Sequence, residues 1–126
     1  MRIGALKESF DGEARVAVTP SSALHLQKLG HEVHVESGAG ARSGFSDAAY
    51  ERAGVTVHPA APALLAAVDV VAKVRPPSEG ELAMMREGQT LISFFYPGQN
   101  SELLEQARGR GVNAIAMDMV PRISRA

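Results

Sequence analysis

The feature that most constrains the fold of this chain is a regular alternation of short apolar segments with segments of helical pattern. Residues 68–74 form an apolar run typical of a strand buried on both faces of a parallel sheet. Strands that alternate with helices form βαβ units with right-handed crossovers. We therefore predict an α/β fold, a three-layer sandwich of the flavodoxin or Rossmann-like kind. Its mostly parallel sheet has about six strands, at residues 2–6, 32–36, 55–57, 68–74, 90–95 and 112–117.

Capping residues indicate where the helices begin and end. Thr19, followed by a proline, predicts a helix N-terminus, and Gly30 predicts its end. Ser78 has a glutamate three residues later, which is the capping-box spacing. We also expect a helix over residues 100–108 and a brief additional strand pairing at 16–18.

Composition excludes several classes of protein. Apolar residues make up 45% of the chain, which is ordinary for a globular fold and argues against disorder. The 13 basic and 14 acidic residues are mixed along the sequence, so we expect no nucleic-acid surface. There is no cysteine, signal-peptide pattern or long apolar run, which predicts a soluble, cytoplasmic domain spanning residues 1–126. The four histidines lack a metal-ligand spacing, and we expect no metal site.

In an open parallel sheet, ligands bind the loops that follow the carboxyl ends of the strands. These loops carry many cations and few carboxylates, which favours an anionic ligand. Lys73, in an otherwise apolar strand, either extends its ammonium to the surface or receives a substrate carboxylate or cofactor group. The same alternatives hold for Arg15. The cations of these loops are Arg15, Arg42, Lys73, Arg75, Arg122 and Arg125.

The glycine-rich residues 37–44 resemble a dinucleotide-binding loop only in part. The G-x-G-x-x-G fingerprint requires its third glycine three residues after the second, whereas here Gly44 follows Gly40 by four residues and so comes one residue late. A tight turn with positive φ is the favoured interpretation. We therefore expect a Rossmann-like sheet without the usual NAD-binding fingerprint.

The C-terminal residues 114–126 predict a buried strand that leaves through Pro121 into a loop with Arg122 and Arg125. An arginine-rich loop after a buried strand suits an anionic ligand. We expect the chain to be the first part of a larger protein, divided within a functional loop.

Several of these stretches together resemble one family. Ile3-Gly-Ala-Leu-Lys-Glu8, Glu13-Ala-Arg-Val-Ala-Val-Thr-Pro20 and residues 29–40 are similar to the N-terminal domain shared by alanine dehydrogenase and the nicotinamide nucleotide transhydrogenase alpha subunit. The resemblance continues through residues 43–54 and covers nearly the whole chain. It implies that residues 1–126 form this domain, incomplete, and that the NAD-binding domain that follows in the family is absent from the chain.

Two places distinguish the branches of this family. Alanine dehydrogenases have a lysine at the position of Lys73 and a histidine in the loop after the next strand, where this chain has Tyr96. A phenol that titrates near pH ~10 is a poor replacement for imidazole in acid–base catalysis near neutrality. Residues 117–126 are similar to the transhydrogenase signature almost throughout. The resemblance favours transhydrogenase; an alanine dehydrogenase-like amino-acid dehydrogenase and a non-catalytic α/β binding domain are the alternatives.

The resemblance implies hydride transfer between NAD(H) and NADP(H), coupled to proton translocation. It places NAD mainly on the missing domain and NADP on a partner component. It also implies a homodimer of the NAD-binding component, which is cytoplasmic and joined to the membrane through membrane-domain and NADP-binding subunits. Hydride transfer needs positioning rather than a protein acid or base, so no catalytic residue is assigned. The expected cofactor-binding residues are Arg122, Ile123 and Ser124, and the possible pocket residues are Arg15, Lys73, Tyr96 and Gln99.

Overall fold

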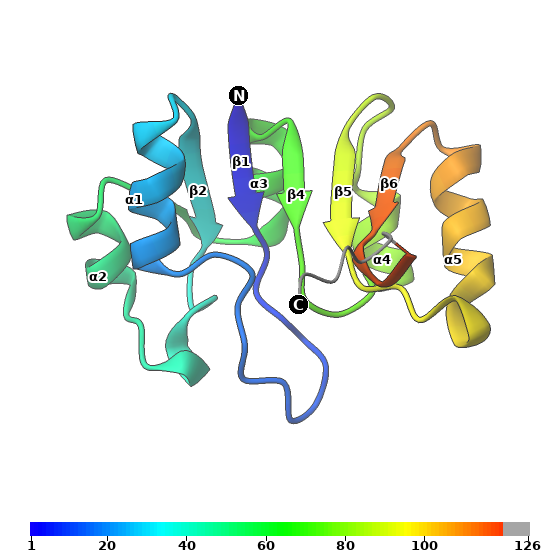
Figure 1. Ribbon diagram of the computed structural model, residues 1–126, viewed down its shortest axis with the longest axis horizontal. Helices are drawn as coiled ribbons and strands as arrows, with labels where there is room; N and C mark the ends of the chain where they lie inside the picture. The colour runs from blue at the N-terminus through cyan, green and yellow to red at the C-terminus, as the bar shows by residue number, and fades with distance from the viewer. Residues whose placement is uncertain (120–126) are drawn as a thin grey trace, which may run out of the picture.

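The computed structural model describes residues 1–119 and contains a six-stranded sheet whose neighbouring strands are all parallel. The strand order is β3-β2-β1-β4-β5-β6 (Figure 1). This is the order of the dinucleotide-binding Rossmann fold rather than that of flavodoxin. The predicted α/β class is confirmed. The strands are β1 (Arg2–Ala5), β2 (Glu32–Glu36), β3 (Thr56–His58), β4 (Val70–Ala72), β5 (Thr90–Ser93) and β6 (Asn113–Ala116).

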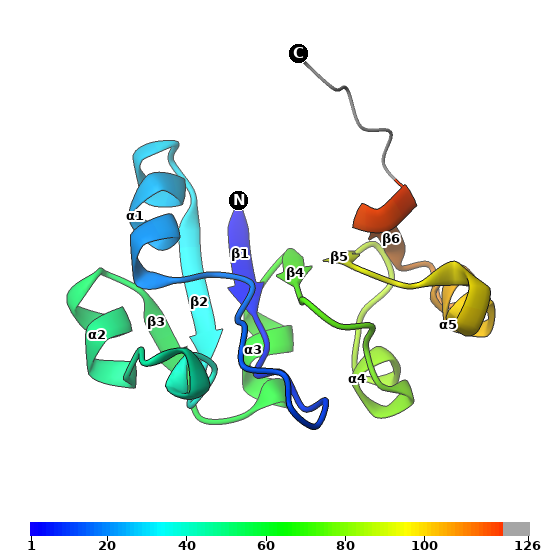
Figure 2. The same ribbon diagram turned by 60° about the horizontal axis from the view of Figure 1, so that its bottom comes forward.

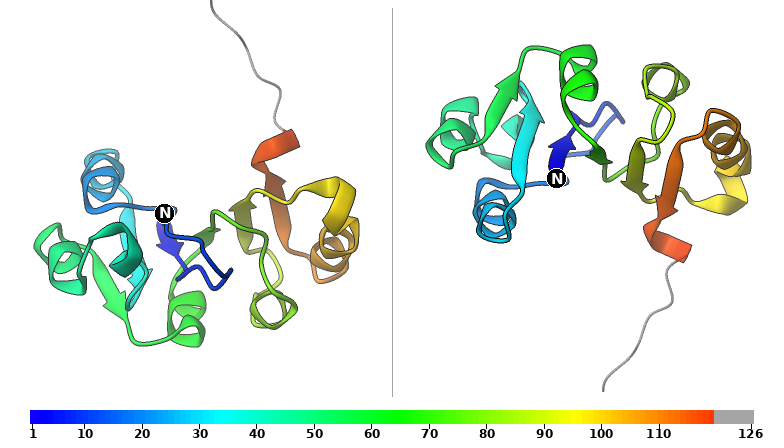
Figure 3. Two further views of the ribbon diagram at one scale, coloured as in Figure 1. Left: turned by 90° about the horizontal axis from the view of Figure 1, so that it is seen from below. Right: turned by 90° about the horizontal axis from the view of Figure 1, so that it is seen from above.

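Helices lie on both faces of the sheet and complete the three layers. The helices are α1 (Pro20–Lys28), α2 (Asp47–Arg52), α3 (Ala61–Ala67), α4 (Glu79–Ala83) and α5 (Pro97–Gly109), with 3-10 turns η1 (Ala41–Ser43) and η2 (Met117–Met119). Figure 3 shows α1 and α2 on one face and α3, α4 and α5 on the other. Within residues 1–119, the face that carries α1 and α2 has no helix over β5 and β6. None of the described helices combines the length and apolar character that a membrane crossing needs.

The sheet separates two apolar clusters. The cluster under α3, α4 and α5 contains fully buried Val71, Leu91 and Phe95. The cluster under α1 and α2 contains Val35 and the fully buried ring of Tyr50, whose hydroxyl donates to the Val18 carbonyl at 2.7 Å. Ala5 and Leu6, at the end of β1, contribute to different clusters, because successive side chains of a strand point to opposite faces of the sheet.

The predicted helix ends are largely confirmed. The Thr19 hydroxyl accepts the Ser22 N–H at 3.1 Å, and Gly30 takes the left-handed conformation (φ 94°) after α1. Ser78 forms the expected capping box with Glu81. These features depend on residues three or four positions apart, so the local sequence specifies them.

One expected element is wrong, and another has an additional turn at its start. Residues 16–18 form no strand, because β1 already has β2 and β4 on its two sides and offers no edge for pairing. The helix expected over residues 100–108 is present as the main part of α5, and a preceding turn from Pro97 joins it across a kink at Asn100, which has non-helical angles (φ −131°, ψ 31°). The Asn100 side chain is bonded to the backbone of the preceding loop, which explains the interruption.

Candidate functional site

The carboxyl ends of the strands gather the long loop after β1, residues 6–19, and the loop after β4, residues 73–78. Figure 2 turns this edge forward and shows the β1 loop in the middle of it. β1 and β4 are neighbours in the sheet. After β1 the chain continues to β2, and after β4 it continues to β5, so the two connections run in opposite directions along the strand order. The two loops therefore meet at the switch point, where open α/β sheets bind their ligands.

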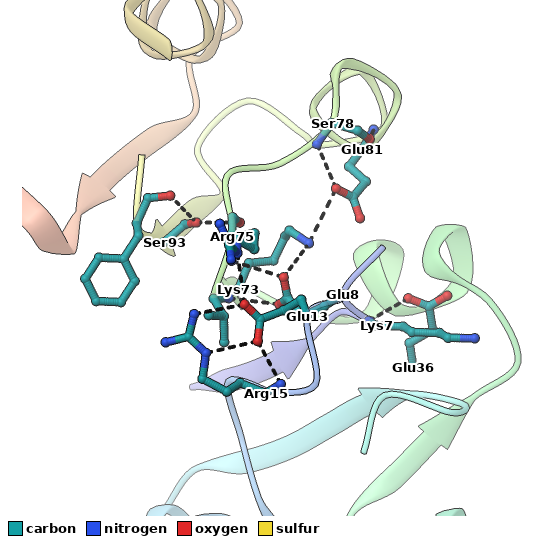
Figure 4. A network of polar contacts seen from close by, with 12 residues as sticks. Lys7, Glu8, Glu13, Arg15, Glu36, Lys73, Arg75, Ser78, Glu81 and Ser93 are labelled. Atoms are coloured by element: carbon teal, nitrogen blue, oxygen red, sulfur yellow. Dashed lines mark hydrogen bonds and ion pairs between the residues drawn. The ribbon is translucent and has the colours of Figure 1, made fainter. Parts of the chain in front are cut away.

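A buried ion pair fills this switch point. The Lys73 ammonium lies 3.2 Å from Oε1 of Glu8 and 3.6 Å from Oε1 of Glu81, and the Lys73 side chain is only 1% exposed (Figure 4). The Glu8 carboxylate also accepts the backbone N–H groups of Val74 at 2.8 Å and Arg75 at 3.0 Å. Lys73 thus neither extends to the surface nor presents an unpaired charge. The Glu8 carboxylate joins the loop after β1 to the loop after β4.

Glu13 forms a second buried centre beside the first. Its carboxylate, 3% exposed, accepts Nε of Arg15 at 2.9 Å and Nε of Arg75 at 2.9 Å. The hydrogen bond from the Arg15 side chain is the largest of the causes that lower the pKa of Glu13, and Arg75 adds to it while burial opposes it. The carboxylate therefore remains charged and holds both guanidinium groups.

Arg15 and Arg75, which both bond to Glu13, differ in how much of each side chain is exposed to solvent. The Arg15 side chain is 62% exposed, and its pKa is raised first by Glu13 and then, more weakly, by the nearby Tyr96 phenol. Arg75 is covered by the Phe10 ring, whose centroid lies 4.1 Å from the guanidinium carbon. Arg15 is thus the more accessible of the two cations of this pair.

The loop after β2 is hydrogen-bonded to the loop after β1 near Glu13. Arg42 donates to the Glu13 carbonyl at 3.3 Å, and the Ser43 hydroxyl donates to the Ala14 carbonyl. These bonds tie η1 to the β1 loop. Three cations of the expected set, Arg15, Lys73 and Arg75, are paired with two carboxylates, Glu8 and Glu13, which stand between them. Sequence reasoning missed the two carboxylates because Glu8 and Lys73 are 65 positions apart and no local pattern links them.

The glycine-rich loop is a tight turn, as expected, but its glycines have different roles. Gly38 and Gly44 have positive φ angles of 82° and 84°. Gly40 does not; a Cβ there would lie 2.7 Å from the Tyr50 ring, so the position requires glycine for space. The Asp47 carboxylate accepts the Gly38 N–H at 2.9 Å, which uses a donor that a phosphate would need.

The described residues do not fit a dinucleotide cradle. The loop after β1 is long and lacks the G-x-G-x-x-G pattern, and the N-terminus of α1 is capped by its own Thr19 and Ser22. The glycine-rich loop instead follows β2. No cluster of three or more His, Asp or Glu side chains suited to a metal ion occurs within residues 1–119.

Tyr96 occupies a strained position at the same edge of the sheet. It precedes α5 with φ 51° and ψ 66°, a left-handed conformation that costs a residue other than glycine about 1–3 kcal/mol. Its ring is 38% exposed and stacks on Phe94, with ring centroids 6.3 Å apart. The Asp118 carboxylate accepts the backbone N–H groups of Phe95 at 3.1 Å and Tyr96 at 2.7 Å. No local sequence pattern indicates this role for Asp118, which lies 22 positions after Tyr96.

Of the expected pocket residues, the structure brings Arg15 and Tyr96 near one another and buries Lys73 in the adjacent ion pair. Gln99 lies in the first turn of α5, and its side chain is outside what the structure describes. The expected cofactor-binding residues Arg122, Ile123 and Ser124 also lie outside the described residues.

The sheet order and the carboxyl-edge loops define a Rossmann-like domain whose described part, residues 1–119, contains no dinucleotide cradle. Residues 4–126 match the family model described as alanine dehydrogenase/PNT, N-terminal domain, and the chain belongs to this family. The alpha subunit of NAD(P) transhydrogenase from Cereibacter sphaeroides is 61% identical over 126 residues, which are 100% of this chain and 24% of the relative. Alanine dehydrogenase from Bacillus subtilis (strain 168) is 38% identical over 120 residues, which are 95% of this chain and 32% of the relative.

Solved structures show the same likeness. The crystal structure of transhydrogenase from Sinorhizobium meliloti superposes with a TM-score of 0.92 at 37% identity, covering 98% of this chain and 37% of that one. An L-alanine dehydrogenase superposes with a TM-score of 0.86 at 37% identity, covering 92% of this chain and 32% of that one. The chain thus spans between about a quarter and about a third of the length of the relatives it matches.

Proposed function

We propose that this chain is the N-terminal domain of the alpha subunit of an NAD(P) transhydrogenase. The protein moves a hydride between NAD(H) on this component and NADP(H) on a partner component, coupled to proton translocation. In the forward direction NADH gives up a hydride and becomes NAD⁺, while NADP⁺ accepts it and becomes NADPH. The observation that carries the proposal is the 61% identity to a transhydrogenase alpha subunit over the whole chain, against 38% to an alanine dehydrogenase.

Tyr96 supports transhydrogenase over amino-acid dehydrogenase. Oxidative deamination needs a group that exchanges protons near neutral pH, and a phenol suits that task poorly. Hydride transfer between two nicotinamide rings needs only that the rings be held close together. Lys73 agrees with this preference, because its ammonium is engaged by Glu8 and Glu81 and is not exposed to a substrate carboxylate.

The described residues lack a dinucleotide cradle, so we place the NAD(H) site mainly in a following domain. Within this chain, Arg122, Ile123 and Ser124 contribute to a loop that contacts the nicotinamide. Arg15, Lys73, Tyr96 and Gln99 belong to the edge that supports this loop. The protein acts as a homodimer on the cytoplasmic side and is peripheral to the membrane through membrane-domain and NADP-binding subunits.

The complete protein, assembled with its partner components, tests the proposal. We expect NADH-dependent reduction of NADP⁺ and no oxidation of NADH by pyruvate and ammonium. Robust pyruvate-dependent turnover would instead make the protein an amino-acid dehydrogenase. Titration of residues 1–126 alone with NADH checks the placement of the cofactor, since micromolar binding would put the nucleotide site in this chain.

The loop assignment has its own test. In the complete protein, Arg122→Ala should weaken NADH binding or slow hydride transfer by about tenfold or more, because it removes a cation from the loop over the nicotinamide. Arg110→Ala is a matched control, since Arg110 follows α5 and is exposed at the opposite end of the sheet. Unchanged affinity and rate for Arg122→Ala would remove Arg122 from the site.

A further inference from the structure

The loop after β5 and the turn after β6 meet at the carboxylate of Asp118. One carboxylate oxygen accepts the Phe95 N–H at 3.1 Å and the other accepts the Tyr96 N–H at 2.7 Å. The Asp118 side chain thereby joins two parts of the chain that are distant in sequence, since Asp118 lies 23 positions after Phe95 and 22 after Tyr96. Asp118 is exposed to solvent, yet these bonds lower its pKa, with the Phe95 N–H as the largest cause.

Asn100 completes the same arrangement from the opposite direction. Its side-chain amide donates to the Phe95 carbonyl at 2.9 Å, and its backbone N–H donates to the Tyr96 carbonyl at 3.1 Å. All four backbone polar groups of Phe95 and Tyr96 therefore have a partner in either Asp118 or Asn100. A left-handed residue other than glycine persists only where its surroundings hold it in this way.

This backbone conformation decides where three aromatic side chains lie. Phe95 is fully buried in the core under α3, α4 and α5. Phe94 and Tyr96 lie at the surface, with their rings nearly parallel at an interplanar angle of 21°. The Tyr96 phenol is among the groups that raise the pKa of Arg15, after the larger effect of Glu13. Asp118 thus fixes the position of Tyr96 relative to the network around Glu13.

We propose that Asp118 is a positioning residue for hydride transfer. It locks Tyr96 in the left-handed conformation and anchors the chain four residues before Arg122. The chain at Asp118 is thereby held at a fixed place relative to Phe95 and Tyr96. This inference rests on the proposed transhydrogenase function, but it concerns a residue to which that proposal assigns no cofactor contact.

Kinetics of the complete protein with its partner components test the inference. Asp118→Asn keeps the size of the side chain and one good acceptor but loses the charge and the second acceptor. We expect a fall of about tenfold or more in the rate of hydride transfer from NADH to NADP⁺. The Kd of NADH should change less than twofold, because Asp118 anchors the loop and does not bind the nucleotide.

Glu105→Gln is the matched control, since it also exchanges an acid for an amide. Glu105 lies exposed on α5 and pairs with Arg108. The Glu105→Gln variant should therefore transfer hydride at the wild-type rate. A wild-type rate for Asp118→Asn, or equal losses of rate and of NADH affinity, would overturn the positioning role. Absence of transhydrogenation in the wild-type protein would instead overturn the proposed function.

A second measurement separates positioning through Tyr96 from a general structural role. Glycine adopts positive φ without strain, so in the Tyr96→Gly variant the hydrogen bonds from Asp118 are no longer needed to hold a strained backbone. We expect Asp118→Ala to lower the Tm of the 126-residue chain clearly in the wild-type background and by less than half as much in the Tyr96→Gly background. Equal decreases in both backgrounds would show that Asp118 does not act through Tyr96.

Discussion

Lys73 and Glu8 form an ion pair that water hardly reaches, with side chains 1% and 2% exposed. Lys73→Met should lower the free energy of unfolding by about 3–5 kcal/mol, because it leaves a buried carboxylate without its cation. The double variant Lys73→Met, Glu8→Gln should recover at least half of this loss. Arg108→Met breaks an exposed pair and serves as the control, with a loss below about 0.5 kcal/mol. Denaturant unfolding measures all four proteins, and a loss below 1 kcal/mol for Lys73→Met would contradict the prediction.

His34 is a second residue whose environment predicts a measurable effect. Its Nδ1 lies 2.9 Å from Nε2 of His58, and the pKa of His34 is lowered first by burial and then by His58, while Glu32 opposes the shift. The unfolded chain, with a histidine pKa near 6.5, therefore takes up a proton more readily than the folded one. Stability should be fully present above about pH 6.5 and should fall as the pH drops below that value toward the lowered pKa.

Unfolding curves between pH 7.5 and 5 check this dependence. His34→Asn should flatten the decline below about pH 6.5, whereas His25→Gln should leave it as in the wild type, because His25 lies exposed on α1. A decline of the same slope in His34→Asn and the wild type would assign the pH dependence to other groups.

How far single residues could be predicted depends on the distance between partners along the chain. Lys73 stood out in the sequence because a lysine within an apolar strand needs a partner. The partner itself, Glu8, could not be identified, since no local spacing connects residues 65 positions apart. The pair of His34 and His58 was missed for the same reason, with 24 positions between them.

At the scale of the elements, two glycines with opposite requirements make a matched test. A Cβ at Gly40 would lie 2.7 Å from the Tyr50 ring, so Gly40→Ala should destabilise the fold by about 1–3 kcal/mol. Gly80 lies within α4, where a Cβ would meet nothing closer than Ser78 Oγ at 3.9 Å. Gly80→Ala should therefore stabilise the fold by about 0.5–1 kcal/mol. Thermal unfolding would contradict the assignment if both changes shifted Tm in the same direction.

The elements also show which features of the fold are local. Helix ends at Thr19 and Ser78 were predicted because each cap bonds to a residue three positions away. The turn of α5 that precedes Asn100 was not predicted, because it follows Tyr96, whose backbone is held by Asp118, a residue distant in the sequence. The choice between flavodoxin and Rossmann strand orders likewise depends on the direction of each crossover, which no local pattern encodes.

At the scale of the whole molecule, the main departure from a fully covered α/β sandwich within residues 1–119 is the sheet face that has no α-helix over β5 and β6. Parallel sheets normally have both faces covered. Three apolar side chains on or beside these strands, Phe94, Ile115 and Met117, are 36%, 43% and 44% exposed. Ile115 pairs in register with Ile92 of β5, so the surface is continuous between the two strands.

This exposed surface predicts the behaviour of the 126-residue chain in solution. It should bind a hydrophobic dye such as anilinonaphthalene sulfonate, because contiguous exposed apolar patches attract apolar ligands. Ile115→Lys should reduce the dye fluorescence at least twofold with little change in Tm, since a charge on the exposed face disturbs no packing. Leu24→Lys is the control, because Leu24 is 49% exposed on α1 and remote from this face. Equal fluorescence from the wild type and Ile115→Lys, or an equal reduction by Leu24→Lys, would show that the dye binds elsewhere.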